Sequence, residues 1–437
     1  MQDRIYYFLL VILIFAGCRK SDYILESSTG FFRDDGSGTG TVTWTKTNEY
    51  YLEGLVFVND GQTLTIEAGT VVRFRTGQAE NASALIVARG GKIIVNGTRE
   101  EPVIFTVEGD NLQGSVAKES GGLWGGLIIL GNAPVNVGGG EARIEGIPFF
   151  EPRGIYGGNN EDDNSGVLRY LSIRHGGTNI GEGNEINGLT LGGVGSATEI
   201  NYIEVISNND DGIEIFGGTV NLRHIVISGC GDDSFDYDLG WSGNGQFWLG
   251  VETGFVGDNL IEAGGGTSPV IGTPNSLPAI YNATLIGNGE TGNGACAVFE
   301  RFAGGVIANS VFVDTRFGII LEVTDGKNDS FSQWKYQKLD IRNNLFYNVG
   351  TAGNSVFELS GVYTEDMENE WADYFNAGEN STGDPEINPG AGEFVPRNKL
   401  SENLSDYPSS WFQLVDFKGA FGEDNWIEGW TLLGSSQ

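Results

Sequence analysis

Two acidic stretches of the sequence hold the side chains best suited to chemistry. They are residues 208–214, which read Asn-Asn-Asp-Asp-Gly-Ile-Glu, and residues 231–236, which read Gly-Asp-Asp-Ser-Phe-Asp. Their acidic residues form three pairs with one common separation in the sequence: Asp210 and Asp232, Asp211 and Asp233, Glu214 and Asp236. If this separation is one structural repeat, three carboxylates of the first stretch stack on three of the second.

Carboxylates stacked at the strand spacing of roughly 4.8 Å repel one another unless a cation, a proton or water relieves the charge. Three interpretations stay open. In the first, these are solvated turn residues whose side chains bond to nearby backbone. In the others, they form a Ca²⁺ site, because hard cations take several oxygen ligands, or they supply catalytic carboxylates. The Ca²⁺ ligands would be Asp210, Asp211, Asp232, Asp233 and Asp236, and the catalytic set Asp211, Asp233 and Asp236.

The catalytic interpretation has a specific precedent. Acidic motifs on consecutive coils are similar to those of polygalacturonase-type glycosidases, where aspartates act as general acid and as base. That family also carries a histidine-glycine motif and an Arg-Ile-Lys motif on later coils. Here His175 and His224 both precede the second acidic stretch, and no Arg-Ile-Lys occurs. A Ca²⁺-dependent lyase would need a base, for which Arg301 or Arg316 is a candidate. We therefore favour a protein that is not an enzyme.

Short strands separated by glycine-rich turns must position these residues. Leu64 and Leu85 are separated by nearly the same interval as the acidic pairs, which predicts equivalent places in one repeat. One phrase recurs from Leu168, Ile200, Leu222, Ile280, Ile307 and Ile341, and a second phrase from Gly188, Gly212, Ser234 and Gly318. Two or three short strands in each period of roughly 20 to 30 residues are typical of a β-solenoid. A β-sandwich also has many short strands, but it gives no reason for one phrase to repeat in register.

We therefore predict an all-β fold, a right-handed parallel β-helix over residues 51–360, with loop insertions at residues 137–165 and 239–278. Trp371, Tyr374 and Phe375 lie at helical spacing and predict a short helix near the C-terminus. Residues 361–437 then form the C-terminal helix and capping segment. The aromatic tail is Trp411, Phe412, Phe417, Phe421, Trp426 and Trp430, and we expect it to cap the open end of the solenoid.

The N-terminus has the organisation of a lipoprotein signal. Residues 1–17 contain a charged head, an apolar run too short to cross a bilayer of about 30 Å, and two small residues before Cys18. This resembles the bacterial lipobox, which implies lipidation of Cys18. Residues 18–50 are then the lipid anchor and tether, and the mature protein is anchored to a membrane.

Composition excludes some functions and leaves others open. The formal net charge of −33 excludes nucleic acid as a partner, because phosphate binding requires a basic surface. The same charge suits an exposed soluble face or sites for hard cations such as Ca²⁺. Cys230 and Cys296 are the remaining cysteines, so the fold does not depend on a disulfide framework. A single bridge between these two is not expected, because they fall at different offsets in the repeat.

Several phrases resemble a family of largely uncharacterised Bacteroidota cell-envelope lipoproteins with pectin-lyase-like β-helices. The resemblance covers most of the mature chain and is carried by residues 121–136, 210–218, 232–236 and 240–247, and by Gly419-Ala-Phe421 with Trp426 and Gly429-Trp-Thr431. It implies attachment to the outer membrane at the cell surface, alongside a TonB-dependent transporter or another envelope protein. The segment after Cys18 has one acidic residue, Asp22, where surface-export signals of this phylum often have several.

The sequence thus favours a surface-associated outer-membrane lipoprotein that acts as a non-enzymatic binding or scaffold component of an envelope complex. Its partners would be the membrane, through the lipid anchor, and an envelope protein or a glycan. The alternative is a polysaccharide lyase or glycoside hydrolase that uses the stacked acidic residues. Ca²⁺ is the one cofactor that the sequence suggests.

Overall fold

The computed structural model describes residues 31–435, apart from residues 182–183, 254–256, 268, 325–326, 352 and 398. The predicted signal peptide and Cys18 lie outside the described residues. Among the described residues, no helix has the length and hydropathy needed to cross a bilayer.

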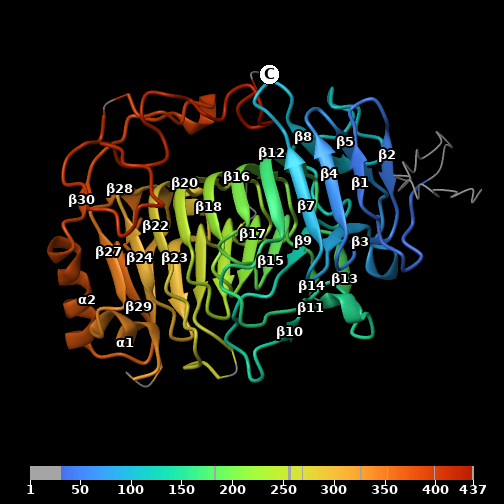
Figure 1. Ribbon diagram of the computed structural model, residues 1–437. Coiled ribbons are helices and arrows are strands. Elements are labelled where there is room, and N and C mark those ends of the chain that lie inside the picture. The colour runs from blue at the N-terminus through green and yellow to red at the C-terminus, as the bar shows by residue number, and fades with distance from the viewer. Residues whose placement is uncertain are drawn as a thin grey trace, which may run out of the picture.

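The chain winds as a right-handed parallel β-helix whose coils stack along one axis (Figure 1). Each coil contributes strands to a 16-stranded sheet, here sheet 1, and to a 10-stranded sheet, here sheet 2. Sheet 1 contains β1 (Val42–Trp44), β2 (Tyr50–Leu52), β4 (Thr63–Glu67), β5 (Val71–Phe74), β7 (Lys92–Asn96), β8 (Val103–Val107), β12 (Gly166–Arg174), β16 (Glu199–Ile206), β18 (Asn221–Ser228), β20 (Asn244–Val251), β22 (Ala279–Ile286), β24 (Gly305–Ala308), β25 (Val311–Thr315), β27 (Leu339–Arg342), β28 (Leu345–Val349) and β30 (Ser381–Thr382).

Sheet 2 lies across the solenoid from part of sheet 1, and the side chains between them form the core. Its strands are β3 (Leu55–Val58), β6 (Ala84–Val87), β9 (Leu127–Leu130), β15 (Leu189–Gly192), β17 (Ile213–Phe216), β19 (Phe235–Asp238), β21 (Ile261–Gly264), β23 (Ala295–Glu300), β26 (Phe317–Val323) and β29 (Phe357–Gly361). Two small hairpins, β10–β11 (Ala142–Arg143, Ile155–Tyr156) and β13–β14 (Asn179–Gly181, Asn184–Glu185), project from the solenoid. The helices are α1 (Ser330–Lys335) and α2 (Glu365–Ala377).

The repeated phrase of the sequence is a stacked row of sheet 1. Leu168 pairs with Ile200, Ile200 with Leu222, Ile280 with Ile307, and Ile307 with Ile341. Between Leu222 and Ile280 the row passes through Gly245 of β20. The repeated phrase is absent from that coil. Alternate residues point inward, so these aliphatic side chains stack in the core and exclude water.

The third residue of each phrase turns the chain between two short strand segments. These residues all have φ between 50° and 60°, a left-handed conformation that asparagine tolerates better than most residues. They follow one another in register along the solenoid as Tyr170, Tyr202, His224, Phe247, Asn282, Asn309 and Asn343, which we call the corner column. The recurring phrase therefore encodes a strand, a corner and a second strand.

Three expectations about the repeat are corrected. Leu64 belongs to sheet 1 and Leu85 to sheet 2, so these leucines are not equivalent although both are buried. Residues 239–278 are not one long loop, because they contain β20 and β21, a further coil of the solenoid. Trp248 is fully buried and stacks on Phe235, so this glycine-rich stretch has its own core residues. Strands also begin at Val42, before residue 51.

The short helix near the C-terminus is present as α2, which begins after Thr364 and covers the last coil (Figure 1). Thr364 accepts a hydrogen bond from Met367 N–H at its start, and acidic residues fill its first turn. The buried Trp371 packs on Phe357 of β29 with ring centroids 4.5 Å apart. The open end of the solenoid is therefore closed by α2.

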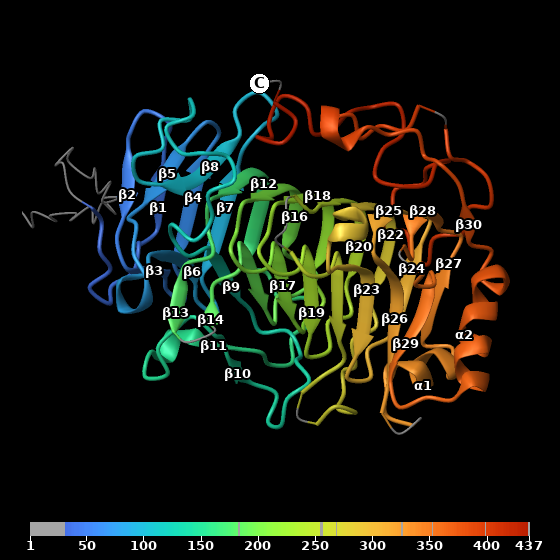
Figure 2. The same cartoon turned by 180° about the vertical axis from the view of Figure 1, so that it is seen from behind.

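The aromatic tail has a different place from the one expected. Residues 399–435 run back over the outer side of sheet 1, from the last coils toward the first, and we call them the strap (Figures 1 and 2). Trp426 and Trp430 pack edge-on against Tyr202 of the corner column. Asn425 and Glu428 accept hydrogen bonds from Arg99, in an N-terminal coil. The aromatic segment thus caps a side of the solenoid, because the column offers it a row of rings to cover.

Candidate functional site

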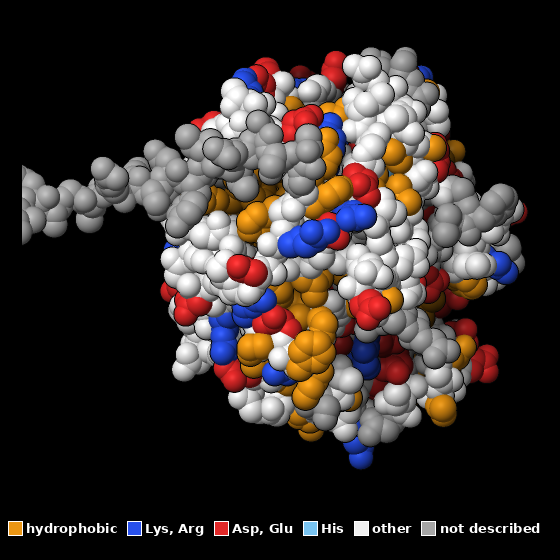
Figure 3. Space-filling view, turned by 90° about the vertical axis from the view of Figure 1, so that its right-hand side faces the viewer, with side chains coloured by type: hydrophobic (Ala, Val, Ile, Leu, Met, Phe, Trp, Pro, Cys, Tyr) orange, Lys and Arg blue, Asp and Glu red, His pale blue; other side chains and the backbone are white. Residues whose placement is uncertain are grey.

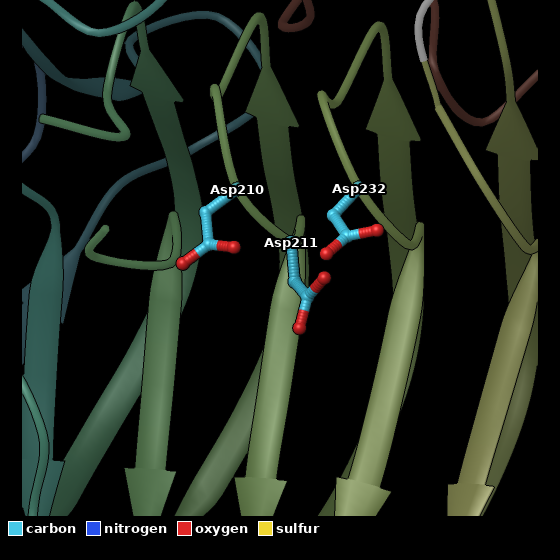
Figure 4. Close-up of side chains that lie close together, drawn as sticks. All are labelled: Asp210, Asp211 and Asp232. Atoms are coloured by element: carbon cyan, nitrogen blue, oxygen red, sulfur yellow. The ribbon is translucent and has the colours of Figure 1, made fainter. Parts of the chain in front are cut away.

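The two acidic stretches occupy the same turn in consecutive coils, between sheet 1 and sheet 2. Residues 207–212 connect β16 to β17, and residues 229–234 connect β18 to β19. The common separation of the predicted pairs is the length of one coil here, because Glu214 pairs directly with Asp236. Figure 4 shows the carboxylates of Asp210, Asp211 and Asp232 gathered on one side of this turn.

Asp211 and Asp233 belong to a ladder of side chains that bond to the backbone of the next coil. Asn187 Oδ1 accepts from Asp211 N–H at 3.3 Å, and Asp211 Oδ1 accepts from Asp233 N–H at 2.9 Å. Asp233 Oδ1 accepts from Asn259 N–H at 2.6 Å, and Asn259 Oδ1 from Ala295 N–H at 3.3 Å. The outer rungs are amides, which make the same bond without charge. The two carboxylates are therefore not needed for the ladder alone.

A second row of carboxylates lies on the outer face of sheet 2. Glu214 of β17 pairs with Asp236 of β19, which pairs with Glu262 of β21. The side chains before and after them in each strand, such as Ile213 and Ile215, point into the core. Alternation along the strand thus forces three acids of consecutive coils onto one face.

These rows converge, and we call the resulting set the acidic face: Asp210, Asp211, Glu214, Asp232, Asp233, Asp236, Asp258 and Glu262. Within it, three groups have carboxylate oxygens that all lie within 4.8 Å of one another: Asp210, Asp211 and Asp232; Asp211, Glu214 and Asp236; Asp232, Asp233 and Asp258. The structure brings together all five predicted Ca²⁺ ligands and adds Glu214, Asp258 and Glu262. Asp211 and Asp232 each belong to two groups, so the groups form one continuous surface.

Burial and mutual repulsion favour protons on this face. Burial, with Glu145 and Asp232 nearby, raises the pKa of Asp210 to about 7. Burial is also the main reason why the pKa values of Asp211, Glu214, Asp233 and Asp236 lie well above the ordinary range. Neighbouring carboxylates raise each of them further. Without a cation, the face therefore holds protons at pH values where carboxylates are normally ionised.

Glu145 brings a further carboxylate to the face from outside the solenoid. It lies in the loop between β9 and β12, which folds over the outer face of sheet 2 through Ile144 and Tyr156. Its side chain bonds to Glu214 and Asn187, and burial raises its pKa. Asn187 Nδ2 also donates to Glu214 Oε2. No spacing in the sequence links residue 145 to residue 214, because the loop leaves the repeat.

The donor set fits a hard cation. Asp236 Oδ1 is a buried oxygen that has no hydrogen-bond partner among the described residues. Several carboxylate oxygens surround one position, and Ca²⁺ takes six to eight oxygen ligands at about 2.3–2.6 Å. A divalent cation at this place would remove the repulsion that now favours protons.

The two arginines offered as bases differ in position. Arg301 Nη1 lies 3.2 Å from Asp238, and its Nη2 lies 3.4 Å from Glu262 and 2.5 Å from Glu300. It therefore stands at the edge of the acidic face, with its charge shared among three carboxylates. Arg316 instead places its guanidinium over the Phe317 ring, at 5.3 Å from the centroid.

Both histidines have structural roles. His175 is buried, and its Nδ1 lies 2.6 Å from the carbonyl oxygen of Ser120. His224 belongs to the corner column and stacks on Tyr202 at 4.2 Å between centroids, with Trp426 edge-on above it. Burial lowers the pKa of His224 to about 3, so its ring is neutral at ordinary pH. Cys230 and Cys296 are both buried and not bonded to each other.

Comparisons with known proteins place this architecture in a family. A sequence profile of the family described as "Pectate-lyase like beta helix domain" matches residues 36–392. Among solved structures, the chain is similar to the Dettilon tailspike protein (gp208), at 10% sequence identity and a TM-score of 0.30. The alignment covers 73% of this chain and 62% of the tailspike chain, so this chain spans less than two thirds of the tailspike. No curated protein matches the sequence.

Proposed function

The chain belongs to the family of pectate-lyase-like β-helix domains, and from that fold we propose that it is a non-enzymatic binding or scaffold lipoprotein of the outer membrane. In this proposal a lipid on Cys18 holds it at the cell surface, as the resemblance to Bacteroidota envelope proteins implies. It serves an envelope complex, with a TonB-dependent transporter or another envelope protein as partner, or it binds a glycan. The acidic face holds Ca²⁺.

One observation carries the non-enzymatic part of the proposal: the groups that would do chemistry already have structural partners. Asp211 and Asp233 each use one oxygen to bond the backbone of the next coil. His224 lies under the strap, on the side of sheet 1. Arg301, the base candidate beside the acidic face, is held by three carboxylates. Such a face is suited to binding a cation and to ordering the surface around it.

The Ca²⁺ part rests on the crowding of Asp211, Glu214 and Asp236. Calorimetric titration of chelator-treated protein with CaCl₂ tests it directly. We expect binding that weakens in Asp236→Asn and is unchanged in Glu368→Gln, a control on the exposed side of α2. Wild-type protein that releases no heat with Ca²⁺, and melts at the same temperature with and without chelator, would contradict a Ca²⁺ site.

The envelope role has its own test. Purification of the detergent-solubilised native protein should recover a transporter or another envelope protein in fixed stoichiometry. Mass analysis should show a lipid on Cys18, and Cys18→Ser should release the protein from the membrane fraction. A chain that is not lipidated, or that purifies alone from intact envelopes, argues against this role.

A second candidate function is a polysaccharide lyase or glycoside hydrolase. It is favoured by the adjacency of Glu214 and Asp236, whose raised pKa values would suit a proton donor, and by Arg301 beside Glu262. A screen of acidic and neutral polysaccharides, with and without Ca²⁺, separates the two candidates. Turnover that is lost in both Asp211→Asn and Asp233→Asn, with the fold intact, would replace the scaffold proposal by the enzyme.

A further inference from the structure

Two adjacent phenylalanines are almost fully exposed on this protein. Phe149 and Phe150 have relative exposures of 82% and 86%, whereas most other aromatic rings among the described residues are buried or half-buried. A single exposed apolar residue needs no explanation, but two neighbouring rings that both point into water do. They lie at the tip of the loop that also carries Glu145, on the side of the molecule where β10 and β11 project (Figure 1).

The loop holds these rings in one place. β10 and β11 pair as an antiparallel hairpin below the tip, and Ile144 N–H donates to Gly154 O at 2.9 Å. Pro148 and Pro152 flank the two rings and restrict the backbone. Glu151 N–H donates to Pro148 O at 2.8 Å, which closes the tip into a turn. A tip ordered in advance loses little entropy when its rings are buried by something else.

Arg153 fixes this loop to the N-terminal coil. Its Nη1 lies 2.7 Å from Asp34 Oδ2 and 3.0 Å from Asn59 Oδ1, and its guanidinium lies over the Phe57 ring at 3.7 Å. Glu151 accepts from its Nε and Nη2 at 2.9 and 2.7 Å. Arg153 is thus paired with two carboxylates, one in its own loop and one in the N-terminal coil. Asp34 and Asn59 both belong to the N-terminal part of the described chain, so the tip lies beside the first coils of the solenoid.

The side chains around the tip suit the boundary between lipid and water. The Arg143 guanidinium lies over the Phe149 ring at 4.8 Å from its centroid, and its Nη1 donates to Glu151 O at 3.0 Å. An arginine beside an exposed ring places a phosphate-binding group at the level of the headgroups. Figure 3 views this end of the molecule and shows hydrophobic side chains gathered on its surface, with Lys and Arg side chains beside them.

We propose that Phe149 and Phe150 insert into the surface of the lipid bilayer to which the chain is anchored. This inference rests on the proposed lipid on Cys18. A convex apolar tip requires a surface that deforms around it, and a bilayer does so without a preformed pocket. The two rings would be a second membrane-binding element beside the lipid chain, and stable attachment to a membrane usually takes two such elements. The tip would fix the orientation of the solenoid above the membrane.

The charge of the protein predicts which lipids matter. With a net charge of −33, the chain is repelled by anionic membranes, so the rings and not the arginines must supply the attraction. Insertion should therefore occur in zwitterionic phosphatidylcholine vesicles and change little between low and high salt.

A fluorophore placed at the tip tests the inference. Phe150→Cys, labelled with an environment-sensitive nitrobenzoxadiazole, is compared with Val362→Cys, which is 77% exposed in the last coil, at the far end of the solenoid. Cys230 and Cys296 are 4% and 0% exposed, so they should not react with the label. The lipidated full chain is reconstituted into phosphatidylcholine vesicles and recovered by flotation.

We expect the label at position 150 to shift to the blue and to be quenched by lipid-soluble quenchers, while the label at position 362 stays in water. Replacing Phe149 by serine should lower the ratio of inserted to water-exposed label roughly tenfold to a hundredfold, the factor in an equilibrium constant that corresponds to burying one phenylalanine side chain. A chain that fails to float contradicts the proposed lipid anchor instead. A floating chain whose label at 150 stays in water, or whose two labels behave alike, overturns the insertion of this tip. Burial of the label only in native membranes, and not in pure lipid, overturns it in favour of a protein partner.

Discussion

Asp211 Oδ1 accepts a hydrogen bond from the backbone N–H of Asp233 at 2.9 Å, so one acidic side chain joins two consecutive coils of the solenoid. The same residue contributes its carboxylate to two of the crowded groups of the acidic face. The bond requires only an oxygen acceptor, whereas the crowding depends on the charge. Substitutions can therefore separate the two roles.

The first prediction makes this separation. Asp211→Asn keeps the acceptor and removes a buried carboxyl group that is costly to ionise, so in chelator at pH 8 it should unfold at a higher temperature than wild type. Asp211→Ala leaves the Asp233 N–H without an acceptor and should be about 1–3 kcal/mol less stable than Asp211→Asn. Urea unfolding of the three proteins measures this order. If alanine and asparagine were equally stable, the ladder bond would contribute nothing.

The second prediction concerns pH. The pKa of Asp210 is raised from 3.8 to about 7, so the folded protein binds more protons than the unfolded chain between these values. The stability linked to the protonated carboxyl is full below about pH 4 and is lost as pH rises through about 7. In chelator, the melting temperature should fall between pH 5 and pH 8. Ca²⁺ should restore it at pH 8 and have little effect at pH 5. A rise in chelator over this range would contradict the assignment.

The third prediction concerns how the strap is held. Glu204 is fully buried, and its two carboxylate oxygens accept from Leu432 and Leu433 N–H at 3.0 and 2.9 Å. Glu204→Gln keeps one acceptor and loses the charge, which should cost about 1–3 kcal/mol and expose the tail to carboxypeptidase. Glu199→Gln, in the same strand but half-buried and paired with Arg169, is the control and should change stability by less than about 1 kcal/mol. Equal protease resistance in both variants would show that Glu204 does not hold the tail.

The fourth prediction uses the corner column. His224 has a φ of 54° in a position where later coils have asparagine. His224→Asn should therefore fold, losing mainly the ring contacts with Tyr202 and Trp426. His224→Val should be about 1–2 kcal/mol less stable than His224→Asn, because a β-branched residue is strained at this φ. In wild type, NMR should show no titration of this ring between pH 5 and pH 8, since its pKa is about 3. Titration near pH 6.5 would mean that the ring is exposed.

Much of the fold could be predicted because residues that stack in successive coils recur at the same place in a repeated phrase of the sequence. The phrase beginning at Leu168 and repeated at Ile200 contains both the inward aliphatic residues and the corner residue, so its repetition fixes the stacking. The coil around Trp248 was not predicted, because Gly245 and Gln246 interrupt the repeated phrase. The large side chain of Trp248 nevertheless fills the core of this coil. The predicted equivalence of Leu64 and Leu85 was wrong, because the strands of both sheets have the same alternation of apolar residues.

The acidic face could be predicted only where it follows the repeat. The common separation of the acidic pairs placed Asp210, Asp211, Asp232 and Asp233 correctly, because each coil there has the same length. Glu262 follows Asp236 after a longer coil, so no fixed spacing reveals it. Glu145 comes from a loop outside the repeat. The position of the strap could not be predicted either, because the aromatic composition of a segment does not determine which surface it covers.

The contact between Arg99 and Glu428 joins residues that are 329 positions apart. Neighbouring coils can associate as soon as each is synthesised, since their contacts are close in the sequence, but this contact must wait until residue 428 has been made. During synthesis the corner column therefore stays uncovered until residues 425–430 have been made. Folding then has a late closing step, and its rate should depend on the length of chain between the two ends more than on the strength of any coil.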